Sequence, residues 1–277
     1  TTRRSSTFQI LWKQINEIVT VLICTMELLF WSTMRARKAR AGLPAGRLEE
    51  EIVRVATAAG REAADVVVAR LGADVLKTKA SRGDLLTAAD AEVQELIERQ
   101  VADAFPSHTF LGEESVAAGP KASADALRAA LDASESEFLW IVDPIDGTTN
   151  FVQGLPLVGI SIGVARRTAA GWELAVGCIV DPFSKLGRPE VFSAVAGGGA
   201  TADGAPISVG DETLADAVVC TGFGPSEASL RPMVRGISAV GAKARTVRML
   251  AKPSVATVEA SPRAIRTWRL SLVAHSA

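Results

Sequence analysis

The spacing of apolar and polar positions predicts different elements in successive parts of the chain. Between residues 48 and 71, apolar side chains recur every three or four positions, which predicts an amphipathic helix. A second helix is predicted to open at Thr87, because Thr87 and Asp90 have the spacing of a capping box with Asp in place of Glu. Later segments are rich in Val and Ile and bounded by Gly or Pro, which predicts strands. These segments are 138–143, 157–166, 172–180, 191–196 and 217–222.

The order of these elements predicts the fold class. Two helices are followed by successive strands of hairpin type, and Asp203-Gly204 marks one hairpin turn. This order favours an α+β protein, in which helices and sheet form separate layers, over a repeating βαβ unit. The triplet at 197–199 lacks the Lys-Ser/Thr that follows in a phosphate-binding P-loop, so it is interpreted as a tight turn or bulge.

Charge divides the chain into three parts. Residues 1–47 hold eight Lys or Arg against two Glu, and residues 241–277 hold seven against one Glu. Residues 48–240 therefore carry a net charge of −13. An acidic body gives no support for nucleic-acid binding. We interpret 1–47 as a leader, a targeting segment or a poorly ordered end, 48–250 as the folded domain, and 251–277 as an atypical tail.

The leader does not read as a membrane anchor. Residues 8–31 are apolar, but Lys13, Glu17 and Glu27 interrupt them, so no stable membrane insertion is expected. The basic run at 35–40 contains no acidic residue and is compatible with an organelle transit peptide.

Cysteine and histidine usage excludes some classes of site. Cys24, Cys178 and Cys220 are odd in number and widely spaced, which argues against a disulfide framework and for a reducing compartment. With only His108 and His275 present, a His-rich zinc site or a His-dependent triad is improbable. The Pro-Ser-His sequence at His108 favours a surface turn.

The stretch 140–151 holds the candidate chemistry. Asp143 and Asp146 stand three residues apart at the end of a strand-like run, with a proline between them. Crowded carboxylates favour a hard divalent cation such as Mg²⁺, and the carbonyl of Ile145 could join them as a ligand. An ordinary turn at Asp146-Gly147-Thr148 would explain the same residues, and this stretch alone leaves both interpretations open.

Two upstream segments extend this pattern: Leu111-Gly112-Glu113-Glu114-Ser115, and Lys79 to Asp90. Together with the 143–150 stretch, they resemble the inositol monophosphatase family of Mg²⁺-dependent, lithium-sensitive phosphatases over about residues 48–250. Segments at 192–199 and 221–224 look most like the plant and algal plastid branch. The resemblance and the basic leader point to the chloroplast, with the cytoplasm as the alternative.

The resemblance implies a layered α-β-α-β-α sandwich and a two-metal mechanism. Glu113, Asp143 and the Ile145 carbonyl would bind the first Mg²⁺, and Asp143 with Asp146 the second. Attack by water on the phosphate would follow, assisted by both ions.

The resemblance also implies roles in catalysis and substrate binding. Thr148, held by Asp90, and Glu113 would orient and deprotonate the attacking water. Asp146, with the backbone amides of Gly147 and Thr148, would bind a small phosphorylated polyol. Inositol 1-phosphate is the expected substrate, and a homodimer is the expected assembly.

The chain departs from the family pattern after Leu250. Family members continue to a Trp-Asp-x-Ala-Ala-Gly segment whose Asp completes the second metal site, whereas the last Asp here is Asp216. We therefore expect an incomplete C-terminal side of the sandwich, weak binding of Mg²⁺ at one site and little activity. Two alternatives stay open: a catalytically impaired homologue that acts as a dimerisation or regulatory partner, and a phosphatase for another ester such as histidinol phosphate.

Overall fold

The computed structural model describes residues 46–72, 75–78, 85–117, 120–208, 213–221 and 227–249. The tail at 251–277, and the leader except for Gly46 and Arg47, lie outside the described residues. Among the helices within those ranges, none combines the length and apolar character needed to cross a bilayer.

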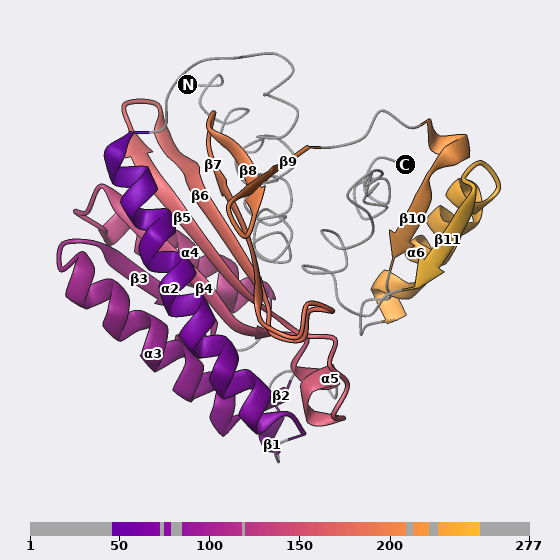
Figure 1. The fold of residues 1–277 in the computed structure, drawn as a ribbon, viewed down its shortest axis with the longest axis horizontal. Helices are drawn as coiled ribbons and strands as arrows, with labels where there is room; N and C mark the ends of the chain where they lie inside the picture. Colours follow the sequence, from indigo (N-terminus) through magenta and orange to yellow (C-terminus); the bar gives the residue numbers. More distant parts are fainter. Residues whose placement is uncertain are drawn as a thin grey trace, which may run out of the picture.

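Two helices form a layer on one face of the main sheet (Figure 1). Helix α2 (Arg47–Arg70) confirms the helix predicted for 48–71, and α3 (Ala88–Ala104) confirms the helix predicted to open after Thr87. Small residues let α2 approach the strands closely. A Cβ atom on Gly60 would lie only 2.6 Å from Cγ2 of Val180.

The main sheet has seven strands in the order in which they follow along the chain. They are β3 (Thr109–Gly112), β4 (Phe138–Asp146), β5 (Gly159–Thr168), β6 (Gly171–Asp181), β7 (Glu190–Val195), β8 (Gly199–Ala202) and β9 (Ala205–Ile207). Strands β3 and β4 are parallel, and every other neighbouring pair is antiparallel. Alternate residues of β4, including Phe138, Trp140 and Val142, are buried in one core with α2 and α3.

Four of the predicted strands are confirmed as β4 to β7, with ends that differ by a few residues. The largest difference is at β4, which continues past the predicted end at 143 to Asp146. The turn at Asp203-Gly204 joins β8 to β9, and both residues adopt left-handed backbone angles, with φ of 47° and 82°. The triplet at 197–199 lies at the tight turn between β7 and β8, as predicted, where the Gly198 N–H donates to the carbonyl of Val195.

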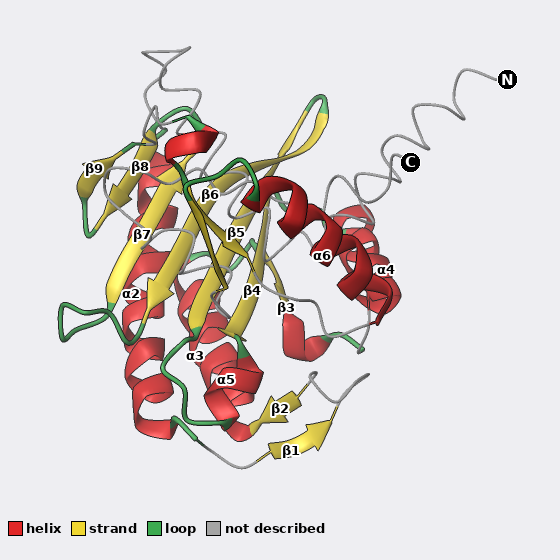
Figure 2. Ribbon diagram, turned by 90° about the vertical axis from the view of Figure 1, so that its right-hand side faces the viewer, coloured by secondary structure: helices red, strands yellow, loops and turns green. Residues whose placement is uncertain are grey.

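Short elements connect the layers. The antiparallel hairpin of β1 (Val75–Thr78) and β2 (Leu85–Thr87) precedes α3 and lies beside α5 (Thr148–Val152), as Figure 2 shows. A single 3₁₀ turn, η1 (Glu113–Ser115), follows β3, and α4 (Pro120–Ala133) then packs beside β3.

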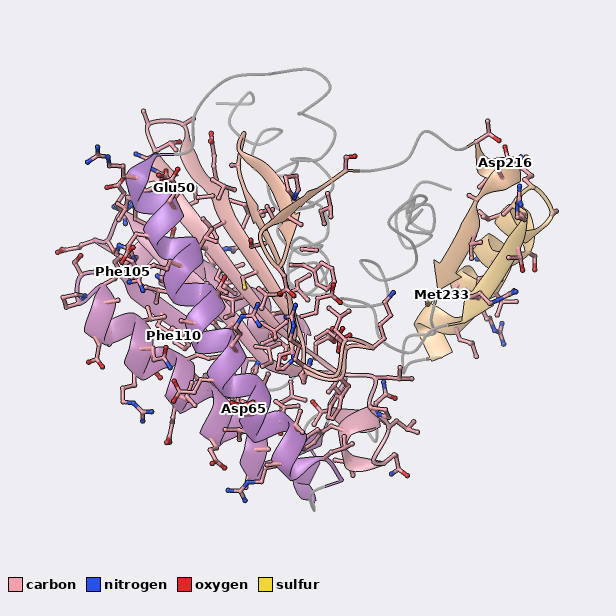
Figure 3. All side chains as sticks on the ribbon, in the orientation of Figure 1. Glu50, Asp65, Phe105, Phe110, Asp216 and Met233 are labelled. Atoms are coloured by element: carbon pink, nitrogen blue, oxygen red, sulfur yellow. The ribbon has the colours of Figure 1, made fainter. Side chains whose placement is uncertain are left out.

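The predicted strand at 217–222 is present but pairs differently from the expectation. After the turn η2 (Leu214–Asp216), β10 (Val218–Thr221) pairs in parallel with β11 (Thr246–Met249), and α6 (Glu227–Gly241) connects them. This β-α-β unit stands apart from the main sheet in Figures 1 and 3, and Figure 3 labels Met233 of α6 and Asp216 of the turn before β10. The single crossover of this unit was not anticipated, because the helix that makes it was not predicted from the sequence.

Candidate active site

The parallel pairing of β3 and β4 brings two acidic residues together. The register sets Gly112 opposite Val142, so Glu113 and Asp143 are the next residues at the same edge of the sheet. A side-chain hydrogen bond joins Asp143 to Glu113. Two of the three segments in the predicted site therefore meet through strand register.

A bulge in β4 places the second aspartate. Asp143 lies opposite Ser161 of β5, whereas Asp146 lies opposite Gly159, so β4 has one more residue than β5 across this stretch. Bulges of this kind redirect side chains near sheet ends. Pro144 fits the irregular stretch because it has no backbone N–H to pair. Both aspartates are buried, with 9% and 6% of their surface exposed.

The start of α3 contributes the third acidic segment. Both the N–H and the Oγ1 hydroxyl of Thr87 donate to Oδ2 of Asp90, at 2.7 and 2.6 Å. The N–H of Ala89 donates in turn to Oγ1 of Thr87. This arrangement confirms the predicted capping box and fixes the carboxylate of Asp90, which is fully buried.

The electrostatics of Asp143 favour a cation. Burial raises the pKa of Asp143 well above its usual range, and the charges of Glu113, Asp146 and Asp90 raise it further. Its Oδ1 atom is buried and, among the described residues, has no hydrogen-bond partner. A bound cation would supply that partner and offset the repulsion between the carboxylates. Carboxylate and carbonyl oxygens are ligands that suit Mg²⁺. The donors therefore fit this ion.

The carboxylates are close but do not yet form a coordination sphere. Within the described part of the chain, no three or more His, Cys, Asp or Glu side chains form a group that could hold a metal ion. The carboxylates also differ in solvent exposure: Glu113 on η1 is exposed, whereas Asp143 is buried. The assignment of Glu113, Asp143, Ile145 and Asp146 as ligands stays a prediction.

The turn after Asp146 is tightly held. Gly147 has a left-handed φ of 95°, and a Cβ atom there would lie 3.0 Å from the carbonyl oxygen of Leu157. The side-chain amide of Asn150 donates to the same oxygen at 2.8 Å. The hydroxyl of Thr148 donates to the carbonyl of Ile145 at 3.0 Å. This differs from the expected bond to Asp90, because a hydroxyl has one proton to donate and the Ile145 carbonyl lies within the same turn.

The interpretation of His108 as a surface turn residue was wrong. Its ring is half-buried and stacks on Phe105, with 4.5 Å between ring centroids. Its Nδ1 accepts a hydrogen bond from Nε1 of Trp140 at 3.0 Å. The local sequence does form a turn, but the ring packs against the neighbouring Phe105 and against Phe138 and Trp140 of β4, which are distant in sequence.

Sequence reasoning also missed Gln94. Its side chain is 7% exposed and contacts η1, which holds Glu113. The available signal was an amide among the apolar positions of α3, one turn after Asp90. Of the predicted segment Lys79 to Asp90, residues 79–84 lie outside the described residues.

The fold and the site define a layered α/β protein that gathers carboxylates at the end of one parallel strand pair. The sequence belongs to the inositol monophosphatase family, whose sequence profile matches residues 48–259. The family assignment made from the motifs is therefore confirmed.

Individual relatives agree with this assignment. Inositol monophosphatase 1 of Xenopus laevis is 33% identical over 174 residues, which cover 61% of this chain and 55% of that protein. The chain thus spans little more than half the length of that relative.

Solved structures show the same fold. The extragenic suppressor protein suhB of Bartonella henselae matches with a TM-score of 0.61 at 24% identity, covering 76% of this chain and 72% of that one. An IMPase/NADP phosphatase complexed with Mg²⁺ and phosphate matches with a TM-score of 0.58 at 20% identity, covering 77% and 72%. The predicted layered fold of inositol monophosphatase type is confirmed.

Proposed function

We propose that this chain is a Mg²⁺-dependent phosphomonoesterase that acts on small phosphorylated polyols, with inositol 1-phosphate as its substrate. The observation that carries the proposal is the buried Asp143, flanked by Glu113 and Asp146 in a chain of the inositol monophosphatase family. The name of the Xenopus laevis relative supports the substrate, and the structural relative complexed with Mg²⁺ and phosphate supports the cofactor.

The metal-binding role falls to oxygen atoms at one edge of the sheet. Glu113, Asp143, Asp146 and the carbonyl of Ile145 would hold Mg²⁺. When bound, Mg²⁺ supplies positive charge that neutralises the phosphate and stabilises the entering and leaving oxygens.

The remaining groups orient the reactants and move a proton. Because the Thr148 hydroxyl donates to the Ile145 carbonyl, its oxygen can still accept a hydrogen bond from a water molecule. The carboxylate of Glu113, an exposed residue, would accept a proton from that water. The backbone amides of Gly147 and Thr148, with Asp146, would hold the substrate.

The second candidate is a catalytically impaired homologue that acts as a dimerisation or regulatory partner. It is favoured by the lack, within the described residues, of three or more side chains already grouped for metal binding. A homologue of this kind would bind Mg²⁺ weakly and release no phosphate.

Phosphate release from inositol 1-phosphate tests the proposal. The protein is assayed with inositol 1-phosphate and, separately, with histidinol phosphate. Each assay is run with and without Mg²⁺, and with added Li⁺. We expect release that requires Mg²⁺ and is lost in an Asp143→Asn, Asp146→Asn double variant. Release that persists without Mg²⁺, or that the double variant retains, would refute the proposal. Binding of Mg²⁺ without turnover of either ester would select the impaired homologue.

A further inference from the structure

The side chain of Gln94 connects α3 to the turn that holds Glu113. Its Oε1 accepts a hydrogen bond from the backbone N–H of Glu114 at 2.9 Å. Its Nε2 donates to Oγ of Ser115, also at 2.9 Å. One buried amide therefore contacts both residues that follow Glu113.

The end of β3 closes over the same amide. A Cβ atom on Gly112 would lie 2.0 Å from Oε1 of Gln94 and 2.2 Å from its Cδ, so no larger residue fits there without moving the amide. Gly112 directly precedes Glu113. The backbone on both sides of Glu113 is thus set against Gln94.

The polar character of Gln94 is costly for the core around it. Val93, Leu96 and Ile97 are buried beside Gln94, and the only other buried polar residue that the structure describes on α3 is Asp90, one turn earlier. Burying an amide there loses hydration that its hydrogen bonds must replace, whereas an apolar residue of similar size would need no partner. The three-residue turn η1 also contacts β4, and the two bonds to Gln94 tie it to α3 on its other side, so they help to fix where η1 lies.

We propose that Gln94 is a positioning residue for Mg²⁺ binding, holding η1 so that Glu113 can meet Asp143. The inference rests on the proposed function, in which Glu113 is a ligand. Groups that orient a ligand typically change metal affinity by roughly 10- to 100-fold when removed.

Gln94→Met tests the inference, because it keeps the length of the side chain and removes both hydrogen bonds. The matched control is Gln100→Met on the same helix, where Nε2 donates to Glu62 and not to η1. Mg²⁺ affinity is measured by calorimetry, and melting temperature is measured without metal. We expect Gln94→Met to bind Mg²⁺ roughly 10- to 100-fold more weakly than the wild type. Gln100→Met should bind like the wild type.

A second variant separates positioning from a general loss of stability. Ser115→Ala removes one of the two bonds from an exposed residue, so its metal-free melting temperature should match that of the wild type. Its Mg²⁺ affinity should fall between those of Gln94→Met and the wild type. If Gln94→Met melts much lower than Gln100→Met, weakened binding by Ser115→Ala supports the inference, and unchanged binding overturns it.

The same measurements distinguish failure of the positioning role from failure of the proposed Mg²⁺-dependent function. If the wild type binds Mg²⁺ and both Gln94→Met and Ser115→Ala bind it equally well, the positioning role alone is overturned. A wild-type chain that binds no Mg²⁺ would overturn the proposed function and the positioning role together.

Discussion

The two ends of the β3–β4 pair use opposite chemistry. At one end, His108 stacks on Phe105 and Phe138, Trp140 packs at a tilt against Phe105 and His108, and the indole N–H has a partner in His108. At the other end lie the carboxylates of Glu113, Asp143 and Asp146, with one buried oxygen lacking a partner among the described residues. In Figures 1 and 3 the ends are separated along the length of α3, with Phe105 at one end and α5 at the other.

This contrast in chemistry assigns stability to one end of the strand pair and function to the other. The aromatic end satisfies its polar groups and buries large rings, which lowers the free energy of the folded state. The carboxylate end crowds like charges in a buried position, which raises that free energy. Sites that break local rules of stability are where function is expected.

The aromatic end should dominate stability. Phe138→Ala removes a ring that is 1% exposed, and we expect it to lower the free energy of unfolding by about 3–5 kcal/mol. Chemical denaturation measures the change. Below the melting temperature, Mg²⁺ affinity should equal that of the wild type. A parallel loss of Mg²⁺ affinity would show that the two ends are not independent.

The carboxylate end should show the reverse pattern. Asp143→Asn replaces a carboxyl that burial and neighbouring carboxylates make costly to ionise, so we expect metal-free stability to rise by about 1 kcal/mol. Phosphate release should fall by roughly 100-fold or more, since losing a ligand should cost at least as much as losing a residue that orients one. Melting temperature and phosphate release measure the two effects. Asp65→Asn, on the exposed face of α2, is the control and should change neither. A loss of stability in Asp143→Asn would contradict the contrast between the ends.

The smallest effect should appear in the pH dependence of the aromatic end. Burial lowers the pKa of His108 below its ordinary value of 6.5, and the charge of Glu137 opposes this only in part. The unfolded chain therefore takes up the proton first as pH falls. The stabilisation is complete above about pH 6.5 and is lost as pH falls through the folded-state pKa.

His108→Asn tests this assignment, because its side-chain oxygen can still accept from Trp140 but does not titrate. We expect melting temperatures between pH 5 and pH 8 to depend less on pH in the variant than in the wild type. Equal pH dependence in the two proteins would assign the effect to other groups.

Local sequence was sufficient where one segment determines its own structure. The capping box of Thr87 and Asp90 and the turn at Asp203-Gly204 depend on residues only a few positions apart, and both were predicted. The acidic motifs were also recognised from local sequence.

Features that depend on distant segments were not predicted. The aromatic stacking of His108 needs Phe138 and Trp140 from another strand. The bonds of Gln94 need the turn after β3, and the parallel pairing of β10 with β11 needs the intervening helix. In each case the local pattern did not identify the partner. The contact forms only when tertiary packing brings a distant segment into place.

The parallel alignment of β3 and β4 has a consequence for how such chains can diverge. Because hydrogen bonding between the strands keeps Glu113 level with Asp143, the crossover that contains α4 can lengthen or shorten without moving either carboxylate. A shift of one residue in the strand pairing would instead turn alternate side chains to the opposite face. Natural variation and engineered insertions should therefore be tolerated in the crossover and rejected in the strands.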